Sequence, residues 1–419
     1  MIKASIITIG DELLIGQVID TNSAFIAQEM NKAGFLISRR VAVGDDYTAI
    51  RNALDEEKKY ADIVLITGGL GPTADDITKP LLCEYFGGKM VVNEMVYVHV
   101  QNIFENILNK PFTERNKKQA EVPDVCKVIE NKKGTAPGMI FEEKINGLNK
   151  IFVSMPGVPF EMKAMMVDDV IPMLQQNFLT TPISHRTLLC AGVGESTVAD
   201  MLQGYENELP INVKLAYLPS YGMLRLRITG TDNDAEKNNL ILDKLFNSLQ
   251  GLVKEFLVSN VDLPLENVLG NLLKQKNETV CTAESCTGGF MAHLFTSIQG
   301  ASSFYDGSVV SYSYKAKEDL LQVQKSTLKT QGAVSEMVVR EMAAGALKNI
   351  GSTYTIAVSG IMGPSGGLPD KPVGTVWICV GDNQKLIAQK FYFRFDRQVN
   401  IRLTAMNAFN MLRKFIIEK

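Results

Sequence analysis

The chain has 419 residues, of which 46% are hydrophobic and 21% charged, and its formal net charge is -3. This length predicts two or three domains, and the composition is typical of a soluble globular protein. The acidic balance argues against a basic nucleic-acid surface, and no apolar run approaches the roughly 20 residues that span a membrane. Six cysteines without C-x-x-C spacing predict reduced thiols, and no signal-peptide pattern precedes the first strand. We therefore expect a cytoplasmic protein that binds neither nucleic acid nor membrane.

The N-terminal domain is predicted over residues 1–179 as a doubly wound α/β sheet. Buried strand patterns alternate with helical patterns, which indicates parallel strands linked by crossover helices. The first three strand patterns lie at residues 5–9, 35–43 and 62–66. Ligands of such sheets bind beyond the carboxyl ends of the strands. The unusual residues lie in three loops that follow strands, at 10–16, 67–76 and 155–159.

Two of these loops favour phosphate and metal chemistry. The glycine-rich segment 68–71 can expose several N–H groups to a phosphate, although no Lys-Ser/Thr pair follows it as in a Walker loop. The carboxylates of Asp11, Glu12, Asp75 and Asp76 could converge on a hard divalent cation that bridges a pyrophosphate. The alternative, in which these carboxylates only cap helices, stays open.

A small α+β module is predicted over residues 180–260, after a polar, proline-containing run at 180–184. Its patterns follow a β-α-β-β-α-β order, which is typical of split-βαβ and KH-like modules. Single-stranded nucleic-acid binding would call for a Gly-x-x-Gly loop, whereas Gly192, Gly194 and Glu195 have the wrong spacing and add a carboxylate. A connector or dimerisation role is therefore favoured over RNA binding.

The C-terminal domain, residues 261–419, is predicted as a separate α/β domain with mixed strand directions. Its main feature is a strand-to-helix turn that holds Ser285, Cys286 and Thr287, followed by Gly288 and Gly289. Free N–H groups and the helix dipole at such a turn favour developing negative charge, and the glycines let a ligand approach the backbone. The turn suits a nucleophile with an oxyanion site, or a hydroxyl that only caps its helix.

A lysine is the predicted base for Ser285, because no histidine is placed for a Ser-His-Asp triad. A lysine whose pKa is lowered by burial or by cationic neighbours can take this role. Lys315 and Lys317 are both available, although two lysines so close together could equally form a solvated face. Cys286 is the rival nucleophile, but it also lacks a histidine partner.

The N-terminal loops carry three short motifs, which are GDELL at 10–14, TGGLGPT at 67–73 followed by Asp75 and Asp76, and MPGVP at 155–159. Together they resemble the molybdopterin-binding family with its MoaB/MogA-like fold, and most of all the N-terminal domain of the CinA competence/damage-inducible family. The resemblance implies metal-dependent ADP-ribose pyrophosphatase activity, with Asp11, Asp75 and Asp76 as ligands of a divalent metal ion. Nucleotide and phosphate contacts would come from Gly10, Glu12, Thr67, Gly68, Gly69, Gly71, Thr73, Pro156 and Gly157.

The C-terminal domain carries five motifs, which are AESCTGG at 283–289, Tyr312-Ser313 with Lys317, GAVS at 332–335, Ser359-Gly360-Ile361 with 363–364, and KPVGTV at 371–376. Together they resemble the CinA C-terminal domain, which also occurs alone as nicotinamide mononucleotide deamidase. The resemblance implies a Ser–Lys dyad, in which Ser285 attacks and Lys317 is the base. We further expect that Tyr312 orients the lysine and that the reaction needs no cofactor. Substrate contacts would come from Glu284, Cys286, Thr287, Gly288, Gly289, Gly360, Gly363, Arg397 and Arg402.

Both resemblances together imply a homodimeric, two-headed enzyme that acts on nicotinamide mononucleotide and ADP-ribose. Tyr314 stands where the family has an asparagine, and Met362 where it has a small residue, so the substrate preference stays open. A molybdopterin-handling transferase is an alternative that would leave the Ser285 domain idle. A non-catalytic adaptor for DNA uptake or damage response is another, but the acidic chain lacks the basic groove that it would need.

Overall fold

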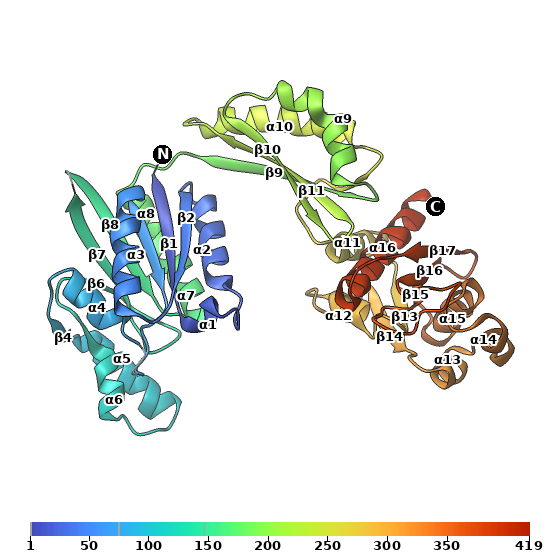
Figure 1. The fold of residues 1–419 in the computed structure, drawn as a ribbon, viewed down its shortest axis with the longest axis horizontal. Coiled ribbons are helices and arrows are strands. Elements are labelled where there is room, and N and C mark those ends of the chain that lie inside the picture. The colour runs from blue at the N-terminus through green and yellow to red at the C-terminus, as the bar shows by residue number, and fades with distance from the viewer. Residues whose placement is uncertain (1, 74–75, 146) are drawn as a thin grey trace. The chain divides into compact units, whose positions relative to one another are not determined.

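The computed structural model describes residues 2–73, 76–145 and 147–419, and the chain divides into two compact units (Figure 1). The first unit is Met1–Ser184 with Gly230–Asn239, and the second is His185–Thr229 with Leu240–Lys419. Among the described residues, no helix has the combination of length and apolar character that a membrane crossing requires.

A six-stranded sheet forms the centre of the N-terminal domain, in the order β2-β1-β3-β8-β7-β6. Its strands are β1 (Lys3–Ile9), β2 (Leu36–Val43), β3 (Ile63–Thr67), β6 (Lys127–Ile129), β7 (Gly138–Ile145) and β8 (Leu148–Met155). β1, β2, β3 and β8 are parallel, which confirms the doubly wound prediction. β7 and β6 extend the sheet in antiparallel fashion, because β7 passes into β8 without a crossover helix.

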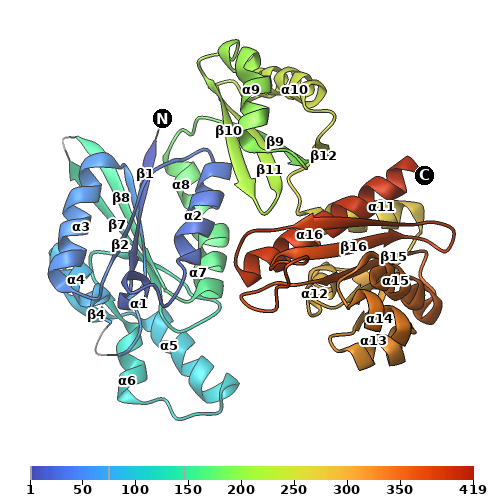
Figure 2. The same ribbon diagram turned by 45° about the vertical axis from the view of Figure 1, so that its right-hand side comes forward.

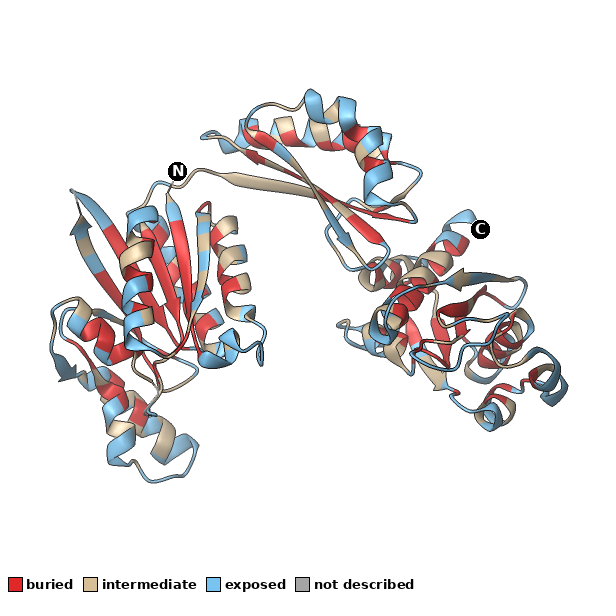
Figure 3. Cartoon of the chain, viewed as in Figure 1, coloured by how far each residue is buried: buried red, intermediate tan, exposed pale blue. Residues whose placement is uncertain are grey.

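Alternate residues of the central strands feed two cores, one on each face of this sheet. Ile6 and Leu65 pack toward one set of helices, and Ile7 and Ile66 pack toward the other. The strands are therefore buried on both faces, as Figure 3 shows, which explains their continuous apolar sequences. The first set is α2 (Thr21–Lys32), α7 (Pro159–Met165), η3 (Met166–Val170) and α8 (Ile171–Asn177), and the second is α3 (Tyr47–Tyr60) and α4 (Thr78–Tyr85).

The remaining N-terminal elements lie outside these layers. They are α1 (Asp11–Leu14), β4 (Met90–Val92), α5 (Glu94–Asn102), η1 (Ile103–Ile107), α6 (Glu114–Lys117), η2 (Lys118–Ala120) and β5 (Glu121–Pro123). β4 and β5 form a separate two-stranded antiparallel ladder.

The middle module has the expected β-α-β-β-α-β order, and its KH-like fold is confirmed. Its elements are β9 (Ile183–Ala191), α9 (Glu195–Asn207), β10 (Val213–Ser220), β11 (Met223–Thr231), α10 (Ala235–Leu252) and β12 (Leu257–Ser259). The four strands form one sheet in the order β10-β11-β9-β12. Leu188, Leu226 and Leu242 belong to the core that holds this sheet and its helices together.

The C-terminal domain is a five-stranded sheet in the order β14-β13-β15-β16-β17, with helices on both faces (Figure 2). Its strands are β13 (Val280–Glu284), β14 (Tyr305–Val310), β15 (Tyr354–Gly360), β16 (Thr375–Gly381) and β17 (Leu386–Tyr392). β13, β14 and β15 are parallel, and β16 and β17 are antiparallel, so the expected mixed directions are confirmed.

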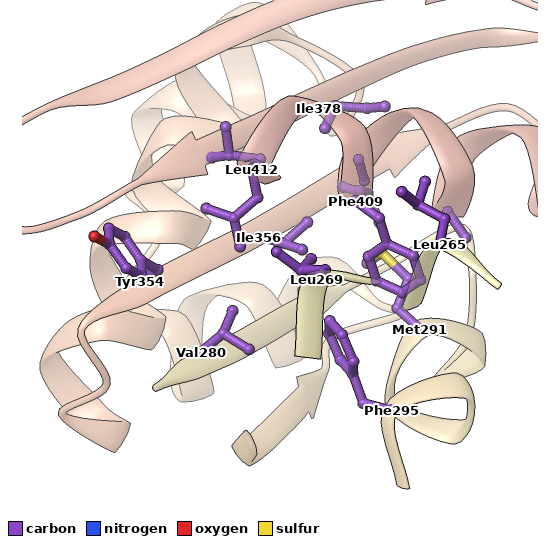
Figure 4. Packing of buried hydrophobic residues seen from close by; sticks show 14 of the residues in the cluster. Leu265, Leu269, Val280, Met291, Phe295, Tyr354, Ile356, Ile378, Phe409 and Leu412 are labelled. Atoms are coloured by element: carbon purple, nitrogen blue, oxygen red, sulfur yellow. The ribbon is translucent and has the colours of Figure 1, made fainter. Parts of the chain in front are cut away.

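One large apolar core fills the side of this sheet that faces α11 (Leu265–Lys276), α12 (Phe290–Thr296), η4 (Ala301–Ser303) and α16 (Arg397–Glu418). Figure 4 shows Phe295 and Phe409 from two of these helices against each other, with ring centroids 4.6 Å apart. The opposite side is covered by α13 (Tyr314–Leu321), α14 (Lys325–Gln331) and α15 (Glu336–Ile350).

Strand register brings three serines to the same edge of the sheet. Glu284 at the end of β13 pairs with Val310 on β14 and with Val358 on β15. Each of these residues is followed by a serine, namely Ser285, Ser311 and Ser359. The carboxyl edge of a parallel sheet is where ligands of α/β proteins bind, so the register itself builds a site there.

Candidate active site in the C-terminal domain

Ser285 lies in the turn between β13 and α12, where two glycines have positive φ. Gly288 has a φ of 62° and Gly289 a φ of 95°, conformations that favour glycine, so the chain can turn tightly here. The Ser285 amide donates to the carbonyl of Val358 at 3.1 Å, which fixes the start of the turn against β15. The Ser285 side chain is thereby held at the edge of the sheet, and the residue is only 8% exposed.

Lys317 contacts Ser285 from the first turns of α13. Its Nζ lies 2.8 Å from Ser285 Oγ and donates to the carbonyl oxygen of Ser311 at 2.6 Å. The residue is 1% exposed, and no carboxylate among the described residues forms an ion pair with it. Burial lowers the pKa of Lys317 to about 8, so roughly one molecule in ten carries the neutral amine at pH 7.

Lys315 has a different environment, although the sequence left both lysines open as the base. Its Nζ forms an exposed ion pair with Asp319 at 2.6 Å. Side chains two residues apart on a helix point in different directions, so only one of the two lysines can reach Ser285. That lysine is Lys317.

Cys286 is buried beside the dyad, and this burial raises the pKa of its thiol to about 12. Nucleophilic attack by cysteine requires the thiolate, which is almost absent near neutral pH at such a pKa. The structure therefore favours Ser285 over Cys286 as the nucleophile.

A cavity of about 170 Å³ opens onto this dyad. Its lining residues are Ser285, Cys286, Tyr312, Lys317, Ala333, Val334, Ser359, Gly360, Met362 and Arg397. It brings together the nucleophile, the base, Tyr312, Cys286, Gly360 and Arg397 of the sequence predictions. Its charged lining residues are both cationic, which favours an anionic ligand.

Arg397 opens α16 and forms one wall of this cavity. It donates through Nη1 to the carbonyl of Gly363 at 3.0 Å and through Nη2 to the hydroxyl of Tyr312 at 3.1 Å. Tyr312 was expected to orient the lysine, but its described hydrogen bond is with Arg397. Lys317 is instead oriented by the carbonyl of Ser311.

Several residues expected to contact substrate lie outside the cavity lining. Glu284 and Thr287 are buried and hydrogen-bonded to each other at 2.7 Å. Arg402 stacks on the rings of Tyr221 and Phe290, with its guanidinium carbon 5.1 and 5.8 Å from their centroids. The side chains of these three residues are engaged within the fold, a direction that the sequence does not reveal, and their role as substrate contacts stays a prediction. Gly288, Gly289 and Gly363 also lie outside the lining and act through the backbone.

The amides of the nucleophile turn are unequally available to a ligand. Three are already engaged, namely those of Ser285 (to Val358 O, 3.1 Å), Gly288 (to Ser285 O, 3.2 Å) and Gly289 (to Glu284 Oε2, 3.1 Å). The amides of Cys286 and Thr287 have no acceptor among the described residues. These two N–H groups are therefore the donors that the turn offers to an oxyanion.

Sequence reasoning missed two parts of this site. The carbonyl of Ser311 fixes Lys317, and backbone atoms leave no signature in a motif. Ser359 donates to the carbonyl of Ala333 at 2.8 Å and so holds the wall formed by Ala333 and Val334. Both serines directly follow a residue that is paired with Glu284 at the sheet edge, a register that no sequence pattern reveals.

The N-terminal loops after β3 and β8 are joined by side-chain hydrogen bonds. Thr67 donates to the carbonyl of Pro156 at 2.9 Å, and Asn22 donates to the carbonyl of Gly157 at 2.7 Å. Gly68 has a φ of 116°, and a Cβ there would collide with the carbonyl oxygen of Ile9. Asn22 also donates to the hydroxyl of Thr67 at 3.3 Å and thus bridges two of the predicted loops.

The described carboxylates of these loops form no metal site. Asp11 Oδ1 accepts from the amide of Asp45 at 3.2 Å, and Asp76 Oδ2 accepts from the amide of Thr73 at 2.9 Å. The Glu12 carboxylate lies against Gly10, and that of Asp76 lies against Gly71. Asp75 lies outside the described residues, and among those described no three His, Cys, Asp or Glu side chains are grouped for a metal. The proposed set of Asp11, Asp75 and Asp76 therefore stays a prediction.

Comparison with known proteins assigns a family model to each domain. The CinA C-terminal domain matches residues 262–416, the probable molybdopterin binding domain matches residues 5–176, and the damage-inducible protein CinA KH domain matches residues 185–258. A CinA-like protein of Cytophaga hutchinsonii is 43% identical over 417 residues, covering 100% of this chain and 99% of the relative. A putative competence-damage inducible protein of Caldicellulosiruptor saccharolyticus is 37% identical, with 99% of each chain covered.

Solved structures match single domains of the chain. A crystal structure of a CinA superfamily protein from Klebsiella pneumoniae is 34% identical and covers 37% of this chain and 97% of its own, with a TM-score of 0.36. A CinA structure from Thermoplasma acidophilum is 31% identical and covers 42% of this chain and 98% of its own, also with a TM-score of 0.36.

Proposed function

The chain belongs to the CinA family, and from that premise we propose that its C-terminal domain hydrolyses the carboxamide of nicotinamide mononucleotide. The products would be nicotinic acid mononucleotide and ammonia. The observation that carries the proposal is the 2.8 Å contact between Lys317 Nζ and Ser285 Oγ in a cavity lined by no carboxylate. A buried amine next to a hydroxyl is the arrangement that Ser–Lys acyl transfer needs.

The first step of the proposed reaction is attack by Ser285 on the carboxamide carbon. Neutral Lys317 accepts the Ser285 proton through its lone pair, while one of its N–H groups still donates to the carbonyl of Ser311. The geometry needs no side-chain movement, because the two reacting atoms are already in hydrogen-bond contact. The amine becomes an ammonium as the new C–O bond forms.

The amides of Cys286 and Thr287 stabilise the negative charge that develops on the carboxamide oxygen. Loss of one such donor typically costs about 3–4 kcal/mol of barrier. The Lys317 ammonium then gives its proton to the carboxamide nitrogen, and the C–N bond breaks to release ammonia and leave an acyl-enzyme on Ser285. Water, deprotonated by the regenerated amine, cleaves the ester and releases the carboxylate product.

Arg397 is the proposed contact for the phosphate of the substrate. Its guanidinium faces the cavity and is held by the neutral oxygens of Gly363 and Tyr312, and no described carboxylate pairs with it. A phosphate monoester would offer it charged acceptors in place of neutral ones, and such hydrogen bonds are stronger.

The N-terminal domain is proposed to hydrolyse the pyrophosphate of ADP-ribose. The support is a pair of loops joined by Thr67 and Asn22, with positive φ at Gly68 and Gly69. The amides of Gly69 and Gly71 have no acceptor among the described residues and could hold a phosphate. Such hydrolysis calls for a divalent cation, and its proposed ligands Asp11, Asp75 and Asp76 rest on the family resemblance alone.

A second candidate for this domain is the handling of a molybdopterin. The match of residues 5–176 to a probable molybdopterin binding domain favours it. It would not account for the Ser285–Lys317 pair, which lies in the C-terminal domain, so the hydrolase proposed for that domain is unaffected by this choice.

Ammonia release from nicotinamide mononucleotide tests the proposed function directly. Ser285→Ala and Lys317→Ala should each lower kcat roughly 10³-fold or more, because each removes one half of the dyad. Lys315→Ala is the matched control, since Lys315 is exposed and paired with Asp319, and it should stay near the wild-type rate. Wild-type turnover in either dyad variant would refute the assignment.

A further inference from the structure

Glu284 is a fully buried carboxylate at the end of β13, immediately before Ser285. No lysine, arginine or histidine among the described residues forms an ion pair with it. Its charge is instead balanced by donors from the start of α12. These are Thr287 Oγ1 at 2.7 Å, Gly289 N at 3.1 Å, Met291 N at 3.1 Å and Ala292 N at 2.8 Å.

These contacts replace the usual cap of α12. The N-cap residue is Gly289, which has no side chain to accept from the first amides of the helix. Glu284 supplies that acceptor from the other side of the turn, so strand end and helix start are tied together around Ser285. An ordinary cap bonds only two or three residues ahead, whereas Glu284 reaches Ala292.

We propose that Glu284 is a positioning residue for the hydrolysis proposed above, acting through the turn that carries Ser285. It holds Ser285 Oγ at Lys317 Nζ and takes up the Gly289 amide, so that the oxyanion is left with the amides of Cys286 and Thr287. The inference rests on the proposed function for its substrate, but its geometric content can be tested without that substrate.

Thr282 Oγ1 is a fifth donor, at 3.3 Å from Glu284 Oε1, and all five contacts come from N–H or O–H groups, so both carboxylate oxygens act only as acceptors. In Glu284→Gln the side chain keeps its size, but its NH₂ group must face a donor whichever way it is turned. This variant therefore weakens the hydrogen bonds between the end of β13 and the start of α12 without opening a cavity. Thr287→Val is a milder second variant, since it removes one donor and leaves the three amides in place.

Glu341→Gln is the matched control. Glu341 lies in the same domain and accepts from the amide of Gln324 at 2.9 Å and from the hydroxyl of Thr327 at 2.7 Å. It is a carboxylate that caps a helix, as Glu284 does, but it does not line the cavity. Glu341 is only partly buried, so its variant should lose less stability, and it serves as the control for labelling and kcat.

The test measures two quantities on the full-length protein, together with its thermal unfolding. The first is the rate at which a fluorophosphonate probe labels Ser285, with Ser285→Ala as the blank. The second is kcat and KM for ammonia release from nicotinamide mononucleotide. Glu284→Gln should lower the labelling rate and kcat roughly 10- to 100-fold with KM within about twofold, because nucleophile alignment is lost while the binding wall stays. Glu341→Gln should lower only the unfolding temperature.

Labelling and kcat within twofold of wild type in folded Glu284→Gln would overturn the inference. If Glu284→Gln does not fold, the test uses Thr287→Val instead. A kcat of Thr287→Val equal to that of the wild type would also overturn the inference. Wild-type labelling without any ammonia release would refute the substrate but leave the positioning role to be judged by labelling alone. Absence of wild-type labelling would overturn the Ser–Lys assignment and this inference together.

Discussion

Burial of Lys317 serves the proposed reaction but lowers the stability of the fold. Its neutral form is the base of the proposed reaction, and burial favours that form by lowering the pKa of Lys317 from its ordinary value of 10.5 to about 8. In the unfolded chain the same lysine stays protonated up to about pH 10.5, so the unfolded state binds more protons between these two values. The folded state is therefore penalised below pH 8, and this penalty is relieved as the pH rises from about 8 to 10.5.

Lys317→Met should make the protein more stable and inactive. At pH 7 its free energy of unfolding should exceed that of the wild type by roughly 3 kcal/mol, since the pKa falls from 10.5 to about 8 and each pKa unit corresponds to about 1.4 kcal/mol. The difference should shrink as the pH approaches 10. Denaturant unfolding at pH 7 and pH 10 measures it, with exposed Lys315→Met as the control. A difference that does not change with pH would contradict the burial of a charged lysine.

Arg397 should determine whether the phosphate of the substrate is recognised. Arg397→Ala should lower kcat/KM for nicotinamide mononucleotide roughly 10- to 100-fold, because a hydrogen bond to a charged group is worth about 1.5–3 kcal/mol. Activity on nicotinamide riboside, which lacks the phosphate, should be unaffected. Arg394→Ala is the control, since Arg394 stacks on Tyr392. Equal losses on both substrates would place the role of Arg397 in the cavity wall rather than in recognition.

Single residues also mark the limit of what the sequence could reveal. The strand-to-helix turn indicated Ser285 from the residues themselves, whereas Lys315 and Lys317 stayed equal candidates for the base and only the resemblance to the CinA C-terminal domain implied Lys317. Glu284, Thr287 and Arg402 lie in or near the same motifs, but their side chains point into the fold or onto aromatic rings. The direction of a side chain depends on how distant segments pack together, and a local sequence pattern carries no information on that packing.

At the scale of elements, the site depends on the register of three strands. β13, β14 and β15 end level with one another, which places Ser285, Ser311 and Ser359 along one edge. Apolar runs predicted the strands themselves, and the mixed directions of this sheet were expected. The register was not predictable, because it depends on how helices from distant parts of the chain pack against the two faces of the sheet. The antiparallel β7 and β6 were missed for a related reason, since strand direction follows from connection length rather than strand sequence.

At the scale of the whole molecule, the two proposed activities should be independent. Every residue that lines the Ser285 cavity comes from the C-terminal domain, whereas Thr67, Gly68 and Asn22 belong to the N-terminal domain. Ser285→Ala should therefore abolish ammonia release and leave ADP-ribose hydrolysis unchanged. Gly68→Ala should lower ADP-ribose hydrolysis and leave ammonia release unchanged, because a Cβ at residue 68 would collide with the carbonyl of Ile9.

Product analysis by mass, with both substrates in one reaction, measures this independence. Repetition with a chelator tests the proposed cation, since ADP-ribose turnover should fall while ammonia release should not. Loss of both activities in Ser285→Ala would contradict independent sites. ADP-ribose turnover that persists with chelator would remove the cation from the proposal.

The dependence of kcat/KM on pH tests the central claim, that a neutral buried lysine takes the proton of Ser285. For wild-type ammonia release from nicotinamide mononucleotide, kcat/KM should rise between pH 6 and 9 with an apparent pKa near 8, as Lys317 loses its proton. Lys317→Ala should be inactive across this range. A flat wild-type profile, or a Lys317→Ala enzyme that keeps the wild-type rate and its pH dependence, would contradict the account.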